Sequence, residues 1–179
     1  LASNLKQDYN VIMTRSDDTF VPLGKRAEIG NDANADLFIS IHLNAASSTS
    51  ANGSEVFYFS KKDSAYAAEV AKFENSVDKG YADVPLSDFI INDIFYRVNQ
   101  QKSAMLATDI LDNIVNEFGL RKRGVFGANF AVLRGSNSPS ILVEIGFVTN
   151  SGDMSTYGTD SSRVKLASEI AQGVRKHFE

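Results

Sequence analysis

The chain has 179 residues, enough for one domain with a sizeable core, and its 43% hydrophobic and 22% charged content is ordinary for a globular protein. The absence of cysteine excludes disulfides and thiolate metal sites. The net charge of −4 gives no basic footprint for nucleic acid, and no apolar run approaches the roughly 20 residues that span a bilayer.

The first residues predict a short helix and then an extended segment. Leu1–Lys6 has the pattern of the end of a helix, so we expect the chain to begin inside a domain. The run "YNVIMTR" that follows predicts a strand at Asn10–Thr14. Pro22 suits the first turn of a helix, which we expect to continue to about Asn34.

Two later segments have the composition of buried strands. Asp36–Leu43, "DLFISIHL", and Ser140–Phe147, "SILVEIGF", are almost continuously apolar and rich in β-branched residues. Strands that helices cover on both faces, as in mostly parallel sheets, have this composition. Ser54–Phe59 and Phe130–Leu133 complete the strand candidates.

Helical segments alternate with these strands. Ser60–Lys79 contains one, and the last helix shows a single apolar face made of Val164, Ala167, Ile170, Ala171, Val174 and Phe178. Another helix has a stripe at four-residue spacing, closed by Gly119 and made of Leu106, Ile110, Ile114 and Phe118. This alternation predicts an α/β fold, with a sheet flanked by helices on both faces.

The segment between Phe59 and Met105 has more residues than a simple crossover requires. Gly80 and Pro85 punctuate it, and a second short helix is expected to start at Leu86 or Ser87. We therefore expect a helical insertion at about residues 60–100.

His42 and Glu144 are the main candidates for chemistry. Each lies near the carboxyl end of a predicted strand, where parallel α/β sheets bind ligands. A carboxylate between Val143 and Ile145 is costly to bury without a partner, and a cation would supply one. The alternative for His42 is a hydrogen-bonded core residue, because the pair does not form a metal motif of diagnostic spacing.

Other polar features predict less. His177 ends the last helix, where a cation is favourable to the helix dipole, and we expect it to be solvated. The basic cluster "LRKRG" at Leu120–Gly124 is expected to be a solvated loop, with contact to an anionic polymer as the alternative. The chain has no Gly-rich phosphate loop after a strand and no Gly-x-Ser-x-Gly nucleophile elbow.

Two long segments resemble the zinc-dependent N-acetylmuramoyl-L-alanine amidases of the third amidase family. They are "VIMTRSDDTFVPLGKRAEIGNDANADLFISIHLNA" and "RGVFGANFAVLRGSNSPSILVEIGFVTNSGD", in family order, and "SIHLNA" and "PSILVEIGFVTN" are their specific parts. The resemblance implies a mixed, mostly parallel sheet between helices. It also implies cleavage of the amide between N-acetylmuramic acid and L-alanine in peptidoglycan, in the periplasm or outside the cell.

Within this resemblance, His42 matches a zinc-binding histidine and Glu144 the catalytic glutamate. The family's first strand, first histidine and zinc-binding glutamate have no match here. Residues 1–179 are thus expected to be an amidase catalytic domain without its N-terminal part, whose missing segment would supply the remaining zinc ligands. Processing or a separate chain would each account for this, and the chain alone is expected to be an incomplete enzyme.

Some amidases of Gram-negative cell division carry a helical segment that covers the site until an activator protein displaces it, with a glutamate on the zinc. Residues 72–99 resemble such a regulatory insertion, and Glu74 is the match for the inhibitory ligand. Its apolar residues would be a packing face or a docking surface for the activator: Phe89, Ile90, Ile91, Ile94 and Phe95. The alternative is an ordinary helical crossover with these residues in the core.

Two other functions stay open from the sequence. One is a non-catalytic peptidoglycan-binding or regulatory module that keeps an amidase scaffold. The other is a zinc peptidase that acts on the peptide bonds of the stem peptide. Product analysis separates these functions from an amidase.

Overall fold

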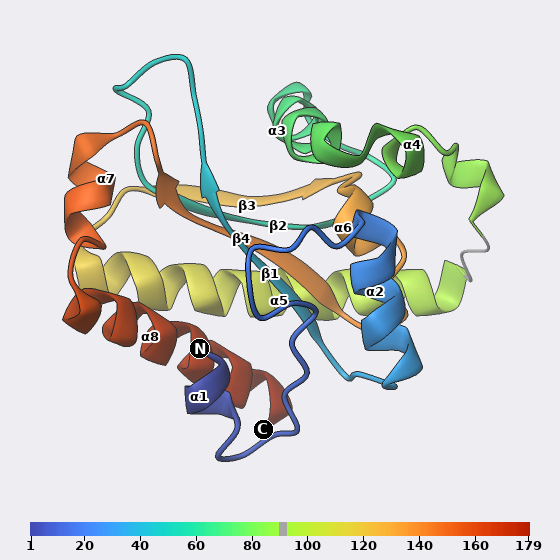
Figure 1. The fold of residues 1–179 in the computed structure, drawn as a ribbon, viewed down its shortest axis with the longest axis horizontal. Helices are drawn as coiled ribbons and strands as arrows, with labels where there is room; N and C mark the ends of the chain where they lie inside the picture. Colours follow the sequence, from blue (N-terminus) through green and yellow to red (C-terminus); the bar gives the residue numbers. More distant parts are fainter. Residues whose placement is uncertain (90–92) are drawn as a thin grey trace.

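A mixed sheet lies at the centre of the computed structural model, which describes residues 1–89 and 93–179 (Figure 1). In this part of the chain the strand order is β1-β4-β2-β3. The strands are β1 (Phe38–Asn44), β2 (Ser54–Phe59), β3 (Lys122–Ala128) and β4 (Ser140–Phe147). β1 is parallel to β4 and β2 to β3, whereas β2 and β4 are antiparallel. The predicted α/β class with a mixed, mostly parallel sheet is confirmed.

Helices cover both faces of this sheet (Figure 1). One face carries α1 (Ala2–Leu5), α5 (Asp93–Phe118) and α8 (Asp160–Phe178). The other carries α2 (Leu23–Asp32), α3 (Ala65–Asn75) and α6 (Ala131–Arg134). A 3-10 turn at Ser76–Asp78 joins α3 to α4 (Lys79–Ala82), another lies at Leu86–Asp88, and α7 (Ser151–Thr156) follows β4. None of the helices in the described ranges is long and apolar enough to cross a membrane.

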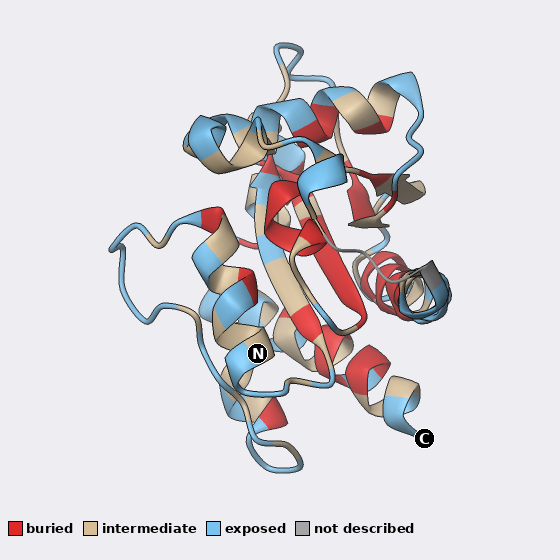
Figure 2. Ribbon diagram, turned by 90° about the vertical axis from the view of Figure 1, so that its right-hand side faces the viewer, coloured by how far each residue is buried: buried red, intermediate tan, exposed pale blue. Residues whose placement is uncertain are grey.

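Alternation along β4 divides the core into two halves. Ile141 and Val143 pack with α5 and α8, whereas Leu142 packs with α2, α3 and α6. Buried residues gather along the central strands and the inward sides of the helices (Figure 2). Because successive side chains of a strand point to opposite faces, Glu144 lies on the same face as Leu142, beneath α3.

The helical stripe that the sequence predicts forms the central contact of α5. Leu106, Ile110 and Ile114 are fully buried, and Phe118 packs against the same core. Gly119 ends the helix with a φ of 64°, a left-handed conformation that favours glycine. In α8 the predicted face is only partly right, because the two positions at its ends, Val164 and Phe178, are exposed.

Two predicted strands are absent, and one strand of the sheet was not predicted. Asn10–Thr14 has no strand structure, and Ile12 and Met13 are exposed, because strand propensity needs a hydrogen-bonded neighbour to take effect. Residues 130–133 lie in and beside the short helix α6, although they are apolar enough for a strand. The strand beside β2 is instead β3, whose glycines and basic residues hide it from pattern analysis.

The predicted insertion is a chain of short elements rather than one unit. Residues 72–99 run from the end of α3, through the 3-10 turns and α4, into the first turns of α5. The turn at Leu86 is confirmed as a 3-10 turn, and the next helix begins at Asp93. Ile94 and Phe95 are exposed, which excludes a core position for them, while Ile90 and Ile91 lie outside the described residues.

A buried and an exposed position of α5 give a matched test of the core. We expect Ile110→Ala to lower the free energy of unfolding by about 2–5 kcal/mol, because it removes buried methyl groups and leaves a cavity. Met105→Ala, on the same helix but exposed, should change it by less than about 0.5 kcal/mol. Urea denaturation measures both, and equal losses would contradict the packing of α5.

Candidate functional site

His42 and Glu144 are direct neighbours across two parallel strands. The register of β1 and β4 pairs them, so both side chains project from the same face of the sheet. Ser40, two residues before His42, lies on this face as well, and its hydroxyl is 3.0 Å from His42 Nε2. The two strand ends that carry the candidate residues therefore meet at one edge of the sheet.

The carboxylate of Glu144 is buried without a partner. Its residue is 0% exposed, and neither carboxylate oxygen has a hydrogen bond within the described part of the chain. Burial raises the pKa of Glu144 to about 9, and the nearby charges of Glu74 and Glu55 add to this effect. Such a group requires either a proton or a cation next to it.

Helix α3 brings Glu74 to the same place. Ser64 caps the helix by accepting a hydrogen bond from the amide of Ala67, and the helix then crosses the sheet toward β1. Glu74 is the second-last residue of α3. Its carboxylate oxygen Oε2 lies 2.7 Å from Nδ1 of His42, and both side chains are largely buried. His42 is thus held at both ring nitrogens, by Glu74 and by Ser40.

The donor set of this cluster fits a divalent cation. One ligand atom each of His42, Glu74 and Glu144 lies within 4.8 Å of the others. Imidazole nitrogen and carboxylate oxygen are ligands that zinc accepts, and a cation here would satisfy the unpartnered oxygens of Glu144. The structure brings together all three residues that the sequence analysis singled out, and their roles in catalysis and metal binding stay predictions.

Comparison with known proteins shows the family and the fold. A family model described as N-acetylmuramoyl-L-alanine amidase matches residues 1–176. The chain belongs to this amidase family. The solved structure of the N-acetylmuramoyl-L-alanine amidase from Clostridium difficile 630 has the same fold, with a TM-score of 0.73 at 29% identity, over 99% of this chain and 77% of that chain.

Two curated amidases are similar along nearly the whole chain. N-acetylmuramoyl-L-alanine amidase AmiC of Neisseria meningitidis serogroup B is 37% identical over 179 residues, which cover 95% of this chain and 42% of that protein. N-acetylmuramoyl-L-alanine amidase AmiA of Escherichia coli K12 is 35% identical over 173 residues, which cover 93% and 60%. The chain therefore spans about half the length of these two relatives.

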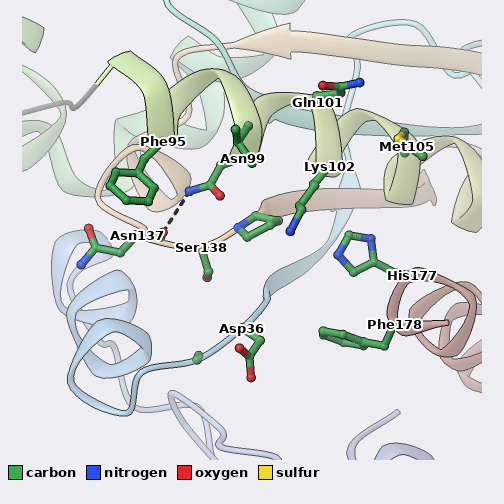
Figure 3. Close-up of a pocket in the computed structure, with 13 residues that line it drawn as sticks. Asp36, Phe95, Asn99, Gln101, Lys102, Met105, Asn137, Ser138, His177 and Phe178 are labelled. Atoms are coloured by element: carbon green, nitrogen blue, oxygen red, sulfur yellow. Dashed lines mark hydrogen bonds between the residues drawn. The ribbon is translucent and has the colours of Figure 1, made fainter.

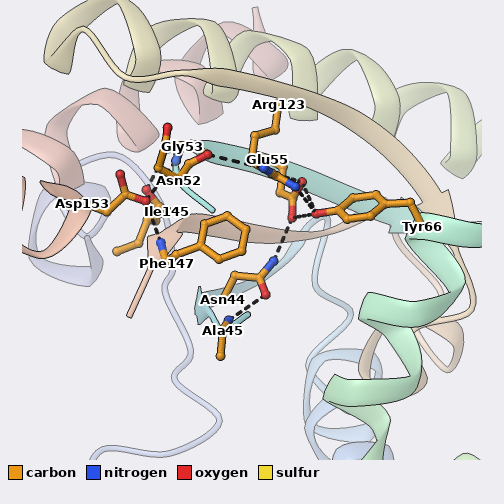
Figure 4. A network of polar contacts seen from close by, with 11 residues as sticks. Asn44, Ala45, Asn52, Gly53, Glu55, Tyr66, Arg123, Ile145, Phe147 and Asp153 are labelled. Carbon is orange, nitrogen blue, oxygen red and sulfur yellow. Dashed lines mark hydrogen bonds and ion pairs between the residues drawn. The ribbon is translucent and has the colours of Figure 1, made fainter. Parts of the chain in front are cut away.

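A second buried glutamate of this amidase domain, Glu55, is fully paired (Figure 4). Glu55 lies opposite Glu144 in the register of β2 and β4, and is 0% exposed. Its carboxylate accepts hydrogen bonds from Asn44 Nδ2 at 2.8 Å, from the Tyr66 hydroxyl at 2.6 Å and from Arg123 Nε at 2.9 Å. Burial and the hydrogen bond to Glu55 raise the pKa of Tyr66 to about 12, so its hydroxyl remains a donor.

Arg123 supplies the positive charge of this network. Its guanidinium lies 4.8 Å from the ring centre of Phe147 and 5.4 Å from that of Tyr66, and Nη2 donates to the Tyr66 hydroxyl. The interpretation of residues 120–124 as a solvated loop is wrong for Arg123. Lys122 is exposed, in an ion pair with Asp112, but it lies in β3 and not in a loop.

The network around Glu55 is not predicted from the sequence, although one sign of a buried, paired carboxylate is present there. Glu55 stands in the apolar run "SEVFYF", and the argument that makes Glu144 conspicuous applies equally to it. Its partner Arg123 lies 68 residues away, in a strand that pattern analysis did not predict. The pair is therefore visible only in the folded chain.

His177 lies away from this site and is less solvated than predicted. It is half-buried at the end of α8, and burial together with the charge of Lys102 lowers its pKa. It lines a hollow of about 750 Å³ next to the starts of β1 and β4, with Asp36, Lys102 and Phe178 (Figure 3). The side chains of His42, Glu74 and Glu144 do not line this hollow.

The two neighbouring cations of β3 give a matched test of the buried network. We expect Arg123→Met to lower the free energy of unfolding by about 3–5 kcal/mol, because Glu55 stays buried without its cation. Lys122→Met removes an exposed pair and should cost less than about 1 kcal/mol. Urea denaturation measures both.

The double variant Glu55→Gln/Arg123→Met is the control for this prediction. It removes both charges, so it should recover much of the stability that Arg123→Met loses. A double variant as unstable as Arg123→Met would show that lost packing, rather than an unpaired charge, causes the effect.

Proposed function

We propose that the protein is a peptidoglycan hydrolase that cleaves the amide between N-acetylmuramic acid and the L-alanine of the stem peptide. Membership of the amidase family supports this reaction class. The observation that carries the proposal is the direct pairing of His42 with the buried, unpartnered Glu144. Because peptidoglycan lies in the cell envelope, we propose a periplasmic or extracellular location.

Zinc is the proposed cofactor, and His42 would hold it through a ring nitrogen. Glu74, which contacts that imidazole, would be a further ligand in the arrangement seen here. Bound zinc would act as a Lewis acid that acidifies water and polarises the amide carbonyl. Ser40 would orient the imidazole, because its hydroxyl contacts the ring nitrogen that Glu74 does not.

Glu144 is the proposed general base. Its carboxylate would accept a proton from the attacking water and deliver it to the nitrogen of L-alanine as the C–N bond breaks. The products are a lactyl carboxylate on the sugar and a stem peptide with a free amino group. This role needs the ionised carboxylate, and burial opposes ionisation by raising the pKa of Glu144, so a cation held beside the carboxylate would have to lower that pKa. No hydrogen bond within the described residues competes for the carboxylate oxygens.

Glu74 is the proposed inhibitory ligand. A carboxylate bound to the zinc would occupy the position that water needs, so the enzyme would be inactive with α3 in its present place. An activator protein acting on residues 72–99 is the proposed partner. Within this segment, four exposed apolar side chains offer such a partner a surface to bind: Phe73, Val77, Ile94 and Phe95.

Substitution of the two paired residues tests the reaction. In the zinc-supplemented protein, Glu144→Gln should keep zinc and lose most turnover, because it removes the base and leaves the imidazole. His42→Ala should lose both. Metal content and the release of intact stem peptide from purified sacculi measure these effects.

The control for this experiment is Glu69→Gln, an exposed glutamate of α3 that should leave both properties unchanged. Full turnover of metal-loaded Glu144→Gln would contradict the assignment of the base. Sacculi that are bound but uncut would instead indicate a binding module, and cleavage inside the stem peptide would indicate a zinc peptidase.

The inhibitory role of Glu74 has its own test. We expect Glu74→Ala to raise basal turnover severalfold, because it removes the carboxylate that contacts His42. Glu69→Ala, five residues earlier in α3 and exposed, is the matched control and should leave the rate unchanged. A rate equal to or below that of the parent protein would contradict the proposal.

A further inference from the structure

The chain that follows Glu74 is fastened to the body of the domain at successive points. The Asn75 side chain accepts a hydrogen bond from the amide of Ala131 at 2.8 Å and donates to the carbonyl of Asn129 at 2.9 Å. Three residues later, Asp78 accepts from the amide of Leu23, at the start of α2. These contacts hold the end of α3 against α2 and α6.

The ring of Tyr81 fills a socket that two glycines leave open. A Cβ at Gly24 would lie 2.6 Å from the ring, and a Cβ at Gly135 would lie 2.9 Å from the Tyr81 hydroxyl oxygen. Neither glycine has a positive φ, so the space and not the backbone conformation calls for glycine there. The socket is formed by α2 on one side and the end of α6 on the other.

Arg134 closes this socket. It is 4% exposed, and its guanidinium lies 4.8 Å from the ring centre of Tyr81 and 4.7 Å from that of Phe89. It also donates to the carbonyls of Tyr81 and Val84. One arginine therefore binds the segment after α4 through two carbonyls and two aromatic faces.

The same arginine makes the closed arrangement reversible. Its Nε is buried without a partner in the described part of the chain. A buried unsatisfied donor costs about 1–3 kcal/mol, which water would recover if the segment moved away. The contacts of Arg134 thus stabilise the docked segment, while its unpaired Nε lowers the cost of release.

Tyr81 is connected to Glu74 without an extended linker. The end of α3, the 3-10 turn Ser76–Asp78 and α4 follow one another directly. A shift of the ring out of its socket would therefore be transmitted to the contact between Glu74 and His42.

We propose that Tyr81 and Arg134 are positioning residues that act as a latch, holding the Glu74 carboxylate against His42. Release of the ring from its socket would remove one of the contacts that hold the end of α3, beside those of Asn75 and Asp78, and would weaken the hold of Glu74 on His42. This inference rests on the proposed inhibitory role of Glu74, and it adds the residues that would set the strength of the inhibition.

Gly24→Ala tests the latch by expelling the ring. Alanine is the better helix former by about 1 kcal/mol, so the substitution does not weaken α2 itself. The matched control is Gly30→Ala in the same helix, whose Cβ would meet Phe38 at an ordinary 3.5 Å. Amide hydrogen exchange at residues 72–84 should be at least severalfold faster in Gly24→Ala and unchanged in Gly30→Ala.

Arg134→Met is a second, independent variant that removes the clamp and leaves the socket intact. Its control is Arg175→Met, which removes a half-buried arginine of α8 that donates to the carbonyl of Asn4. Only Arg134→Met should accelerate exchange at residues 72–84.

The contact at the site is followed by NMR at fixed pH. The chain has two histidines, so the ring-proton resonance of His42 is read against that of His177. In Gly24→Ala and Arg134→Met it should move toward its position in Glu74→Ala. Unchanged exchange and an unchanged His42 resonance in both variants would overturn the latch.

Turnover measured on the same samples separates the latch from the proposed function. Faster exchange with a raised basal rate supports both. Faster exchange with no hydrolysis in any variant, including Glu74→Ala, would overturn the amidase function of this chain and support the latch as a mechanical device.

Discussion

The structure depends on one pairing, that of His42 on β1 with Glu144 on the adjacent parallel strand β4. Parallel register places the two side chains on the same face, and the core on both sides of β4 removes Glu144 from water. The result is a buried carboxylate without a hydrogen bond from the described residues, next to an imidazole. That combination is unfavourable for an isolated protein core and favourable for a site that receives a cation.

The contrast between Glu144 and Glu55 explains how the sheet tolerates two buried carboxylates on neighbouring strands. Glu55 receives hydrogen bonds from Asn44, Tyr66 and Arg123, so its charge is compensated locally. Glu144 accepts no hydrogen bond from these three residues. Because Arg123 pairs with Glu55, it does not compensate Glu144, and burial together with the charges of Glu74 and Glu55 raises the pKa of Glu144 to about 9. Family membership and this asymmetry together support hydrolytic chemistry at Glu144.

Helix α3 connects the two glutamates. Tyr66 near its start binds Glu55, and Glu74 near its end contacts His42 beside Glu144. The helix therefore lies across the site as a cover that is anchored at its start by a buried network. Its end is held through Tyr81 and Arg134, by packing that two glycines permit. In the proposed latch, the fixed start and the releasable end of α3 would together let this cover act as a switch.

The amino-acid sequence by itself determined the α/β class, the stripe of α5 with its terminal Gly119, and the two strands that carry His42 and Glu144. These follow from local periodicity and composition, which act within one element. Family resemblance added Glu74. Only the tertiary structure decided that residues 10–14 form no strand and that residues 122–128 form β3. It also decided that the charge of Arg123 is paired with that of Glu55, and that α2 and α6 leave space for the ring of Tyr81. Each of these outcomes depends on which distant segment lies alongside, and a local pattern does not contain that information.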